Sequence, residues 1–533
     1  MAARLSLACL CSIARPRGLA PGVALVAALL LAGCASLPKD VQRPVSQALA
    51  PTDTTFLGRL VDQKRPPTIA RDLSGFALLA SPDMAYAGRL ALTRQASRTL
   101  DIQYYSIHVD STVSSLLRAV RAAARRGVRV RILLDDFNSV GRDAQVMRMA
   151  NVPGVEMRMF NPLPGDRSAG LLRALWSLGD LARIQRRMHN KLYVADNAWG
   201  IVGGRNLGDA YFGTAHERDF VDMDVLAAGP VVRSISAGFD RYWNSPLAYP
   251  VASLITPAKL ARLRQVTEPA SGDGAADKPA APRAQALPPP LDLAALPLVW
   301  APAGLLVDSP LKLMPADDGG HADDTVIEGL LSLLRTAQHD VIIVSPYFVP
   351  GKQMMALFAR LEARGVRVRV LTNSLASTDA LLAQVGYARH REQLLRLGIE
   401  LYEMRARERA RLRDTVLGSG SRGSHASLHA KLVIVDGRVI GIGSMNLDLR
   451  SKLRNTEIAL VIRSPILAHR AAGHVLAVIA VAAWKVERTP DGALRWHAPS
   501  GVRLPGVDHD PDTSVWLRLL TKLLAPLTPD DLL

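Results

Sequence analysis

The sequence predicts an α/β protein in which one fold occurs twice. Three short segments recur at nearly the same spacing. Arg126–Arg131 (Arg-Gly-Val-Arg-Val-Arg) returns unchanged after 238 residues. His189-Asn190-Lys191 returns as His429-Ala430-Lys431 after 240, and Asp101-Ile102 returns as Asp340-Val341 after 239. Three unrelated segments at one offset indicate an internal duplication.

Each copy alternates strand-like and helix-like segments. In the first copy we expect a strand at residues 99–107, a helix at 111–125 that ends at Gly127, and a strand at 128–134. The second copy repeats the order, with strands expected at 341–344 and 366–372 around a helix at 352–364. Such alternation predicts helices packed on a mostly parallel or mixed sheet.

Length and charge limit the function. A chain of 533 residues is long enough for two domains, and 49% apolar residues with 21% charged residues is a globular composition. The net charge of +17 favours an anionic partner, either nucleic acid or an anionic lipid surface.

The N-terminus resembles a bacterial lipoprotein signal. Arginines precede a short apolar run at 23–32, and Leu31-Ala32-Gly33-Cys34 resembles a lipobox. The resemblance implies removal of residues 1–33, acylation of Cys34 and an N-terminal tether at 34–55. It places the protein at a bacterial membrane, facing the periplasm, with the outer membrane favoured. The alternative is an uncleaved apolar anchor.

The remaining chain divides into four predicted parts. Residues 56–266 and 297–510 form the two copies, and the Ala/Pro-rich stretch 267–296 is expected to be a flexible linker. Residues 511–533 contain Trp516, Leu519, Leu520, Leu523 and Leu524 at helical spacing, with Arg518 and Lys522 on another face. This pattern suits a helix in a lipid interface, and equally a helix docked on the domain core. The apolar stretch 475–484 is expected to be a buried helix.

Two copies of a chemical motif stand at corresponding places. His189-x-Lys191-x4-Asp196 is followed after six residues by Gly203-Gly204-Arg205-Asn206. His429-x-Lys431-x4-Asp436 is followed after six residues by Gly443-Ser444-Met445-Asn446. Residues two apart in a strand share a face, so each His is expected to project beside its Lys. Gly204, Asn206, Ser444 and Asn446 are candidates for binding phosphate oxygens.

These residue types fit phosphodiester chemistry. One neutral His can attack phosphorus, an imidazolium can protonate the departing alcohol, and two lysines can hold the phosphoryl oxygens. The scheme needs no metal and no cofactor. His425 and His429 lie four apart but lack the Glu of a zinc-protease motif, so His425 is interpreted as a loop residue.

The paired motifs resemble the HKD motifs of the phospholipase D superfamily. The resemblance implies two phospholipase D-like α/β sandwich domains with a shared active site at their interface. It makes His189, Lys191, Asp196, His429, Lys431 and Asp436 the candidate catalytic residues, although Asp196 and Asp436 could equally be structural partners at strand ends. It also implies an acidic residue that orients each His, for which Glu457 and Asp219 are the candidates.

Further segments resemble bacterial cardiolipin synthases, most closely the type called C. They include Leu100–Tyr105, Asp209–Phe212, Tyr347–Pro350, Leu371–Leu375 and Gly386–Arg389. The resemblance implies transfer of a phosphatidyl group through a phosphohistidine, with phosphatidylglycerol and phosphatidylethanolamine as possible lipids, no nucleic acid partner, and a monomeric enzyme. A hydrolytic phospholipase D, a nuclease and an inactive membrane scaffold are the alternatives.

Overall fold

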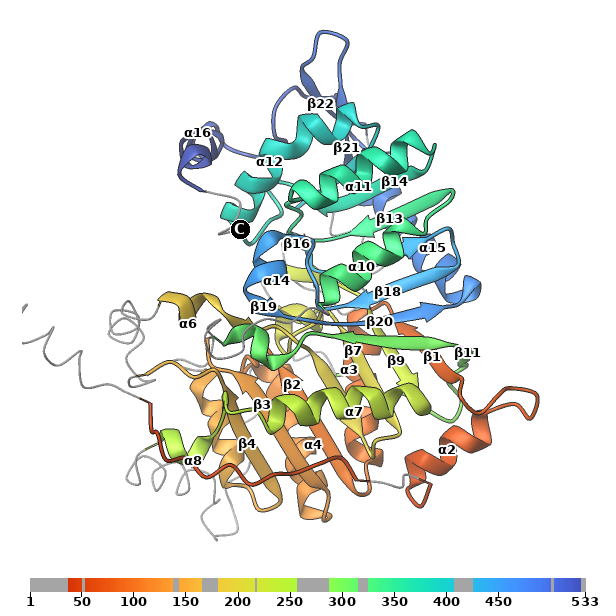
Figure 1. The fold of residues 1–533 in the computed structure, drawn as a ribbon, viewed down its shortest axis with the longest axis vertical. Coiled ribbons are helices and arrows are strands. Elements are labelled where there is room, and N and C mark those ends of the chain that lie inside the picture. Colours follow the sequence, from red (N-terminus) through yellow and green to blue (C-terminus); the bar gives the residue numbers. More distant parts are fainter. Residues whose placement is uncertain are drawn as a thin grey trace, which may run out of the picture.

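A computed structural model describes residues 37–49, 53–137, 143–164, 181–215, 218–255, 287–314, 325–406, 425–499 and 503–528. They form two nine-stranded sheets, one from each half of the chain, with helices on both faces of each sheet (Figure 1). The predicted duplicated α/β architecture is therefore confirmed. The signal segment 1–33 and Cys34 lie outside the described residues.

The first sheet has the order β10-β4-β3-β2-β6-β7-β9-β1-β11. Its central strands β2, β3 and β4 are parallel, and the others pair antiparallel. The strands are β1 (Ser74–Leu79), β2 (Thr99–Tyr104), β3 (Arg129–Asp135), β4 (Val155–Phe160), β6 (Leu192–Ala195), β7 (Trp199–Gly203), β9 (Asp224–Ala228), β10 (Ala248–Pro250) and β11 (Val299–Ala301).

The second sheet has the order β12-β20-β18-β17-β13-β14-β15-β21-β22. Read from the opposite end, its strands from β15 to β12 repeat the order and directions of β4 to β1. The strands are β12 (Ala303–Val307), β13 (Asp340–Val344), β14 (Arg367–Asn373), β15 (Glu400–Met404), β17 (Leu432–Val435), β18 (Val439–Gly443), β20 (Ile458–Arg463), β21 (Ala483–Arg488) and β22 (Leu494–His497).

Strand register corrects one of the three sequence repeats. Asp196 and Asp436 are equivalent, and their backbone N–H groups donate to the carbonyls of Thr99 and Asp340. Thr99, not Asp101, is therefore the structural counterpart of Asp340. The two aspartates still do similar work, because Asp101 pairs with Arg131 and Asp340 with Arg369.

The helices cover both faces of each sheet. The predicted helix at 111–125 is confirmed, and Gly127 follows it with φ of 92°. Asp110 caps its first turn, and Leu116 and Val120 are on its buried face. The helices are α2 (Phe56–Lys64), α3 (Pro82–Gln95), α4 (Ser111–Arg125), α6 (Leu181–Gln185), α7 (Pro230–Trp243), α8 (Val251–Leu254), α10 (Val326–Arg335), α11 (Lys352–Ala363), α12 (Leu381–Arg396), α14 (Leu449–Leu453), α15 (Pro465–Ala482) and α16 (Val515–Leu524).

The two halves share one apolar core. Helices α7 and α15 lie between the sheets, where α7 contacts β12 and α15 contacts β1. Buried side chains from both sheets, such as Val202 and Ile442, join those of α7 and α15 in a single cluster. Each sheet also has an apolar core of its own beneath its outer helices. Burial of this much apolar surface holds the halves as one body.

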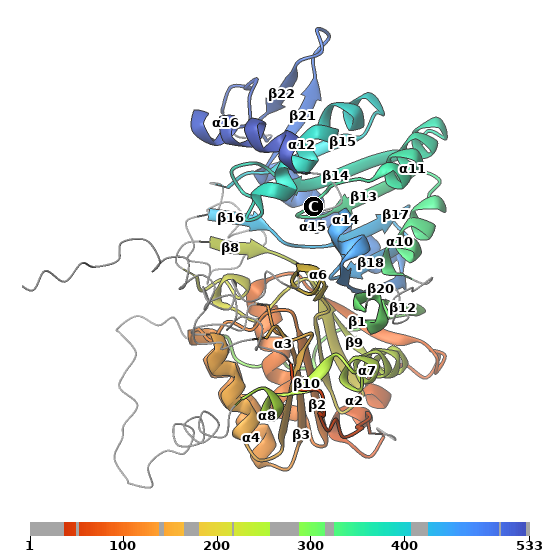
Figure 2. The same ribbon diagram turned by 60° about the vertical axis from the view of Figure 1, so that its left-hand side comes forward.

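Two short parallel strand pairs also cross between the halves. β8 (Arg218–Val221) pairs with β16 (His425–Leu428), and β5 (Arg187–Met188) pairs with β19 (Asn455–Thr456). Figure 2 shows β8 and β16 side by side between the two main sheets. Both pairs end directly before the sequence motifs, so they determine where the two histidines lie.

The chain changes sheet at Pro302, not at residue 297 as the predicted domain boundary has it. Val299–Ala301 forms β11 and pairs with β1 of the first sheet, and the next strand, β12, pairs with β20 of the second. The end of the predicted linker is also packed against the first half. Leu293 is buried there, and the backbone N–H of Leu291 donates to the carbonyl of Ala87.

The described part of the predicted N-terminal tether runs along the first half. Arg131 donates to the carbonyl of Ser46, Asp240 accepts from the N–H of Ala48, and Arg43 donates to the carbonyl of Ala248. Residues 43–49 are therefore held against the first half of the chain.

The apolar stretch predicted at 475–484 is divided between a helix and a strand. α15 ends at Ala482, and Trp484 belongs to β21. Within the described part of the chain, α15 alone is long and apolar enough to cross a membrane. One face of α15, including Leu467, Ala471 and Val475, is buried in the shared core, as the prediction of a packed helix requires.

The predicted C-terminal helix is α16, and it buries none of its residues. Trp516 is 81% exposed and Leu523 is 67% exposed, with Leu519 and Leu520 also in solvent. α16 contacts α12, and most of its apolar side chains are exposed, which fits a helix in a lipid interface better than a helix docked on the domain core.

We predict that Gly443→Ala destabilises the protein by about 1–3 kcal/mol, because a Cβ there would lie 2.0 Å from the carbonyl oxygen of Ile458. Thermal unfolding measures the effect. Gly473→Ala is the matched control, since a Cβ at this position in α15 meets nothing within 4 Å. This change replaces a glycine inside a helix and should not destabilise the protein. Equal stability of the two variants would contradict the close packing of β18 on β20.

Candidate active site

The two histidines lie where the chain leaves the small strand pairs and enters the main sheets. His189 follows β5, and its N–H donates to the carbonyl of Thr456 in the second half. His429 follows β16, and its N–H donates to the carbonyl of Val221 in the first half. The expectation that His and Lys share a strand is wrong, because β6 and β17 begin only after the lysines.

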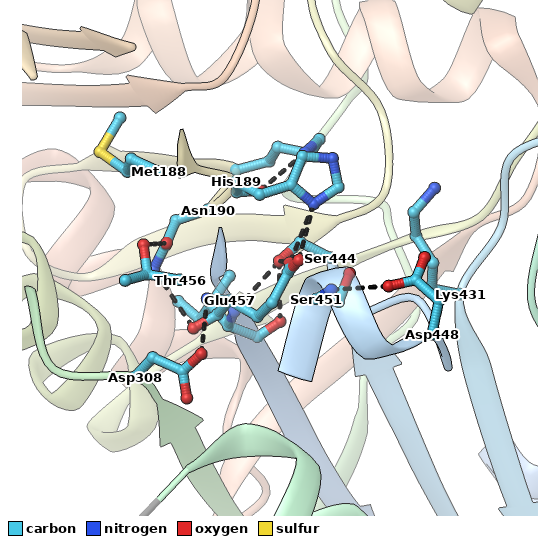
Figure 3. Close-up of polar contacts among 12 residues, drawn as sticks. Met188, His189, Asn190, Asp308, Lys431, Ser444, Asp448, Ser451, Thr456 and Glu457 are labelled. Atoms are coloured by element: carbon cyan, nitrogen blue, oxygen red, sulfur yellow. Dashed lines mark hydrogen bonds and ion pairs between the residues drawn. The ribbon is translucent and has the colours of Figure 1, made fainter. Parts of the chain in front are cut away.

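Each histidine is bound by a carboxylate from the opposite half. Nδ1 of His189 lies 3.0 and 2.9 Å from the two carboxylate oxygens of Glu457, a pair visible in Figure 3. Nδ1 of His429 lies 2.8 Å from an oxygen of Asp222. Both contacts are buried, and they leave Nε2 of each ring as the nitrogen available for chemistry.

Asp222 therefore takes the place predicted for Asp219, while Glu457 is where the sequence placed it. Strand register shows why. Gly203 pairs with Asp224, and Gly443 pairs with Ala459. Asp222 and Glu457 each lie two residues before these partners and are thus equivalent. The usable sequence pattern was an acidic residue one or two positions before the strand that pairs with the glycine strand, Glu457 before β20 and Asp222 before β9.

The small residues of the glycine segments make room for the carboxylates. A Cβ on Gly204 would lie 2.6 Å from a carboxylate oxygen of Asp222. Its counterpart Ser444 instead donates its hydroxyl to Glu457 (Figure 3). Gly204 and Ser444 are therefore placed to support the acidic residues.

The two lysines are buried beside the histidines. Nζ of Lys191 donates to the carbonyl oxygen of His189 at 2.6 Å, and Nζ of Lys431 lies 3.0 Å from Nδ1 of His429. Burial lowers the pKa of Lys431 to about 8 and the pKa of Lys191 well below its ordinary value. This burial outweighs the nearby charges of Glu457 and Asp222, which act on both lysines and raise their pKa. An anionic phosphate beside the two lysines would favour their protonated forms.

Both histidines are held neutral in the unliganded site. Burial, with the charge of Lys431, lowers the pKa of His429 to about 4 in spite of Asp222. Burial and the charges of Lys191, Lys431 and His429 also lower the pKa of His189 well below its ordinary value. Charges from the other half act on His189, so the two motifs share one electrostatic environment.

The two orienting carboxylates differ in charge. Burial raises the pKa of Glu457 to about 7. Burial would also raise the pKa of Asp222, but the hydrogen bond and charge of His429 and the charges of Lys431 and Arg205 hold it below its ordinary value. Arg205 is buried, and its counterpart Met445 carries no charge. The duplicated site is therefore electrostatically asymmetric.

Aromatic side chains line the histidines. Tyr105 packs edge-on against His189 at 5.1 Å between ring centroids. Tyr211 and Phe220 pack on His429 at 5.1 and 5.0 Å. Such walls keep water away from the imidazoles and fix their ring planes.

The two asparagines of the glycine segments are also buried near the site. The side-chain amide of Asn206 donates to the hydroxyl of Tyr211 at 3.0 Å. Its carbonyl oxygen and that of Asn446 have no hydrogen-bond partner within the described structure. Buried polar atoms of this kind are open to a bound ligand.

Asp196 and Asp436 do not reach the histidines. The carboxylate of Asp196 accepts from the backbone N–H groups of Ser97, Arg98 and Thr99, and that of Asp436 does the same at residues 338–340. Both lie in turns with φ near 50°, beyond the far ends of β6 and β17. Of the two interpretations of these aspartates, the geometry fits the structural partner at a strand end and not the catalytic group.

Two residues that were not identified from the sequence hold the backbone directly before the histidines, one in each copy. Asp135, at the end of β3, accepts from the N–H of Met188. Its counterpart Asn373 accepts from the N–H of Leu428. Each therefore fixes the residue directly before a histidine. A polar residue closing an apolar strand in both copies, as in Leu-Leu-Asp and Leu-Thr-Asn, was the available pattern.

Asp308 is a further missed residue. Its carboxylate accepts from the N–H of Glu457 at 3.0 Å and from Lys312 at 2.7 Å, and Figure 3 shows it below Glu457. No copy of this aspartate exists in the repeat, so sequence symmetry could not reveal it. Within the described residues, no group of three or more His, Cys, Asp or Glu side chains could hold a metal ion.

Comparison with known proteins agrees with this geometry. The family model described as "Cardiolipin synthase, PLD-like domain" matches residues 90–243 and 330–477. The chain belongs to this family. The two matched segments contain the two histidine motifs and fall one in each half, as the duplicated fold requires.

Relatives within the family extend over most of the chain. Cardiolipin synthase C of Escherichia coli is 37% identical over 84% of this chain and 94% of its own length. Cardiolipin synthase A of Pseudomonas entomophila is 26% identical over 72% of this chain and 64% of its own length. The phosphatidylserine synthase structure from Haemophilus influenzae shares the fold, with a TM-score of 0.56, 14% identity and coverage of 89% of this chain and 98% of its own.

We predict that Asp222→Asn lowers kcat by roughly 10²–10⁴-fold, because the amide cannot stabilise an imidazolium at position 429. Asp219→Asn, a change of the same size at a buried aspartate three residues earlier, is the control and should stay within about tenfold of the wild type. Steady-state kinetics on a chromogenic phosphodiester measure both. A larger loss in Asp219→Asn would return the orienting role to Asp219.

Proposed function

We propose that the protein is a phosphatidyltransferase that makes cardiolipin-type products through a covalent phosphohistidine. The main support is the pair of buried histidines, each oriented through Nδ1 by a carboxylate of the opposite half. This arrangement leaves two Nε2 atoms for two different tasks at one phosphorus. The names of the relatives, cardiolipin synthases A and C, indicate the lipid class.

In the first step, neutral Nε2 of His189 attacks the phosphorus of the donor phospholipid. The bond from phosphorus to the departing alcohol breaks, and the oxygen of that alcohol takes a proton from Nε2 of protonated His429. Lys191 and Lys431 hold the non-bridging oxygens, which gain negative charge in the transition state. The products are an alcohol and a phosphatidyl group on His189.

In the second step, Nε2 of His429, now neutral, takes the proton of an acceptor hydroxyl. The acceptor oxygen attacks phosphorus, the bond to His189 breaks, and the new phosphodiester leaves. A lipid hydroxyl on phosphatidylglycerol gives cardiolipin. Water as acceptor gives phosphatidic acid, so exclusion of water decides between synthase and hydrolase.

The charge difference between the carboxylates supports this division of roles. Asp222 is held ionised beside His429, and an ionised carboxylate stabilises the imidazolium that a general acid needs. Once an anionic phosphate is bound, its charge raises the pKa of His429 from about 4 toward protonation. The pKa of Glu457 is raised to about 7, so Glu457 stabilises a positive charge on His189 less than Asp222 does on His429. His189 therefore stays neutral more readily, as a nucleophile must.

Membrane docking is the second part of the proposal. The apolar face of α16 bears an exposed Trp, and Arg518 and Lys522 flank it, as in helices that lie at anionic lipid surfaces. In Figure 2, α16 projects to the same side of the molecule as β8 and β16, the strands that precede Asp222 and His429. A membrane on that side would bring lipids to the site.

The test of the activity is a product assay by mass spectrometry. Purified protein on phosphatidylglycerol vesicles should release cardiolipin and glycerol, and His189→Ala should release neither, because each histidine has a role that no other residue fills. A comparison of cardiolipin yield with and without added phosphatidylethanolamine shows which lipid donates the phosphatidyl group. Phosphatidic acid without cardiolipin would make the protein a hydrolase, and no lipid product would reject the proposal.

The roles of the two histidines can be separated with a phosphatidyl ester of p-nitrophenol. This leaving group departs without a proton, so His429→Ala should give one burst of p-nitrophenolate and a phosphatidyl group trapped on the His189 peptide. His189→Ala should give no burst. A burst from His189→Ala with label on His429 would reverse the assignment.

We predict that replacing Trp516 and Leu523 together by Ser weakens binding to anionic vesicles by at least about tenfold, because two exposed apolar side chains lose their burial in lipid. Vesicle co-sedimentation measures it. Leu311→Ser changes an exposed leucine outside α16 and serves as the control. Unchanged vesicle binding of the double variant would exclude α16 as the docking helix.

A further inference from the structure

The second half contains a large cavity beside the proposed catalytic centre. It measures about 1070 Å³, at the upper end of ordinary ligand pockets. Residues of helices α10, α11, α12 and α14 and of the turn before α11 line it. Its lining residues include Ile327, Leu331, Val349, Met354, Met355 and Leu449.

The wall of the cavity is mostly aliphatic. α10 contributes Ile327 and Leu331, and α11 contributes Met354, Met355, Ala356 and Ala359. Methionine side chains adapt to flexible apolar ligands. The turn that precedes α11 is Val349-Pro350-Gly351. It overlaps the Tyr347–Pro350 segment, which has no role in the proposed phosphoryl transfer. A Cβ on Gly351 would lie 2.8 Å from Leu449, so this glycine keeps α14 close.

One end of the cavity borders the catalytic groups. Asp448 lines it and also lies close enough to Lys431 for its charge to raise the pKa of that lysine. Figure 3 shows Asp448 and Lys431 as neighbours. Asp448 therefore connects the lining of the cavity with the surroundings of Lys431.

The rim of the cavity is cationic. Lys352 and Lys452 both line it. Lys452 donates to Gln353 at 2.6 Å and lies 3.5 Å from Glu328. Lys352 has no hydrogen bond or ion pair to the described part of the chain and is exposed. An aliphatic wall, a cationic rim and a phosphoryl-transfer site at one end match the parts of an anionic phospholipid.

We infer that this cavity binds a hydrocarbon chain of a phospholipid substrate whose phosphate or glycerol lies at Lys431. The inference rests on the proposed function and adds to it a site for the lipid chain. Only the second half contributes the helices of this cavity, so the two substrate lipids are held differently although the catalytic motifs are paired.

Photolabelling tests the inference without turnover. Phosphatidylglycerol with a diazirine at the end of one acyl chain is added, in mixed micelles, to His189→Ala protein. We expect label on the peptides that carry Met354, Met355 or Leu331. The second variant carries both His189→Ala and Ala356→Phe, and its added ring on α11 occupies space in the cavity. The label should then fall at least about tenfold, because a misfit of one methylene group in an apolar pocket already weakens binding that much.

Ala363→Phe is the matched control, since Ala363 lies on the same helix but outside the cavity. Label elsewhere, or equal label in both variants, would overturn the inference. In otherwise wild-type protein, Ala356→Phe should raise KM for long-chain phosphatidylglycerol about tenfold and leave the dibutyryl lipid within twofold. Absence of phosphatidyl products from the wild type would reject the proposed function alone, because the labelling is measured separately.

Discussion

The crossed pairing of histidines and carboxylates is the interaction on which the site depends. Glu457 of the second half binds His189 of the first, and Asp222 of the first binds His429 of the second. All four groups are buried, and each would be costly without its partner. The small strand pairs β5–β19 and β8–β16 bring the partners together by backbone hydrogen bonds. Neither half could therefore form a working site alone.

The same constraint explains where the duplication is not symmetric. In the first half, buried Asp224 pairs with Arg89 and lies 3.4 Å from Arg205, and the charge of Arg205 adds to the effects of His429 and Lys431 that lower the pKa of Asp222. In the second half, Met445 and Ala459 occupy the equivalent places and form an apolar contact region. One copy supports a charged carboxylate and the other leaves its carboxylate with a raised pKa. Such a difference fits the proposed division of roles between one nucleophile and one acid.

The sequence predicted the duplicated fold and the His and Lys positions well, because repetition and spacing are local properties of the chain. The helix at 111–125 follows from its apolar face and from Gly127. Pairing between the halves could not be read in the same way, since hydrogen bonds from His189 to Thr456 and from His429 to Val221 join residues far apart in sequence. The sequence points to Asp219 and not to Asp222, because the register between β7 and β9 is not visible without the sheet.

For the aspartates of the HKD motif, the sequence pattern was a poor guide to function. Asp196 and Asp436 stand at identical spacings from the histidines, and the resemblance to the HKD motif makes them catalytic candidates. The structure gives the spacing another cause, since β6 and β17 have the same length and each ends in a turn closed by aspartate. Equal spacing in the two copies can therefore result from a shared fold as well as from a shared catalytic role.

Histidine-selective ¹⁵N NMR tests the crossed pairing most directly. The Nδ1 resonances of His189 and His429, assigned with His→Gln variants, would be followed in Glu457→Gln and Asp222→Asn protein. Crossed pairing predicts that Glu457→Gln shifts mainly the His189 resonance and Asp222→Asn mainly that of His429. The reverse pattern, in which each change shifts the histidine of its own half, would contradict the shared site described here.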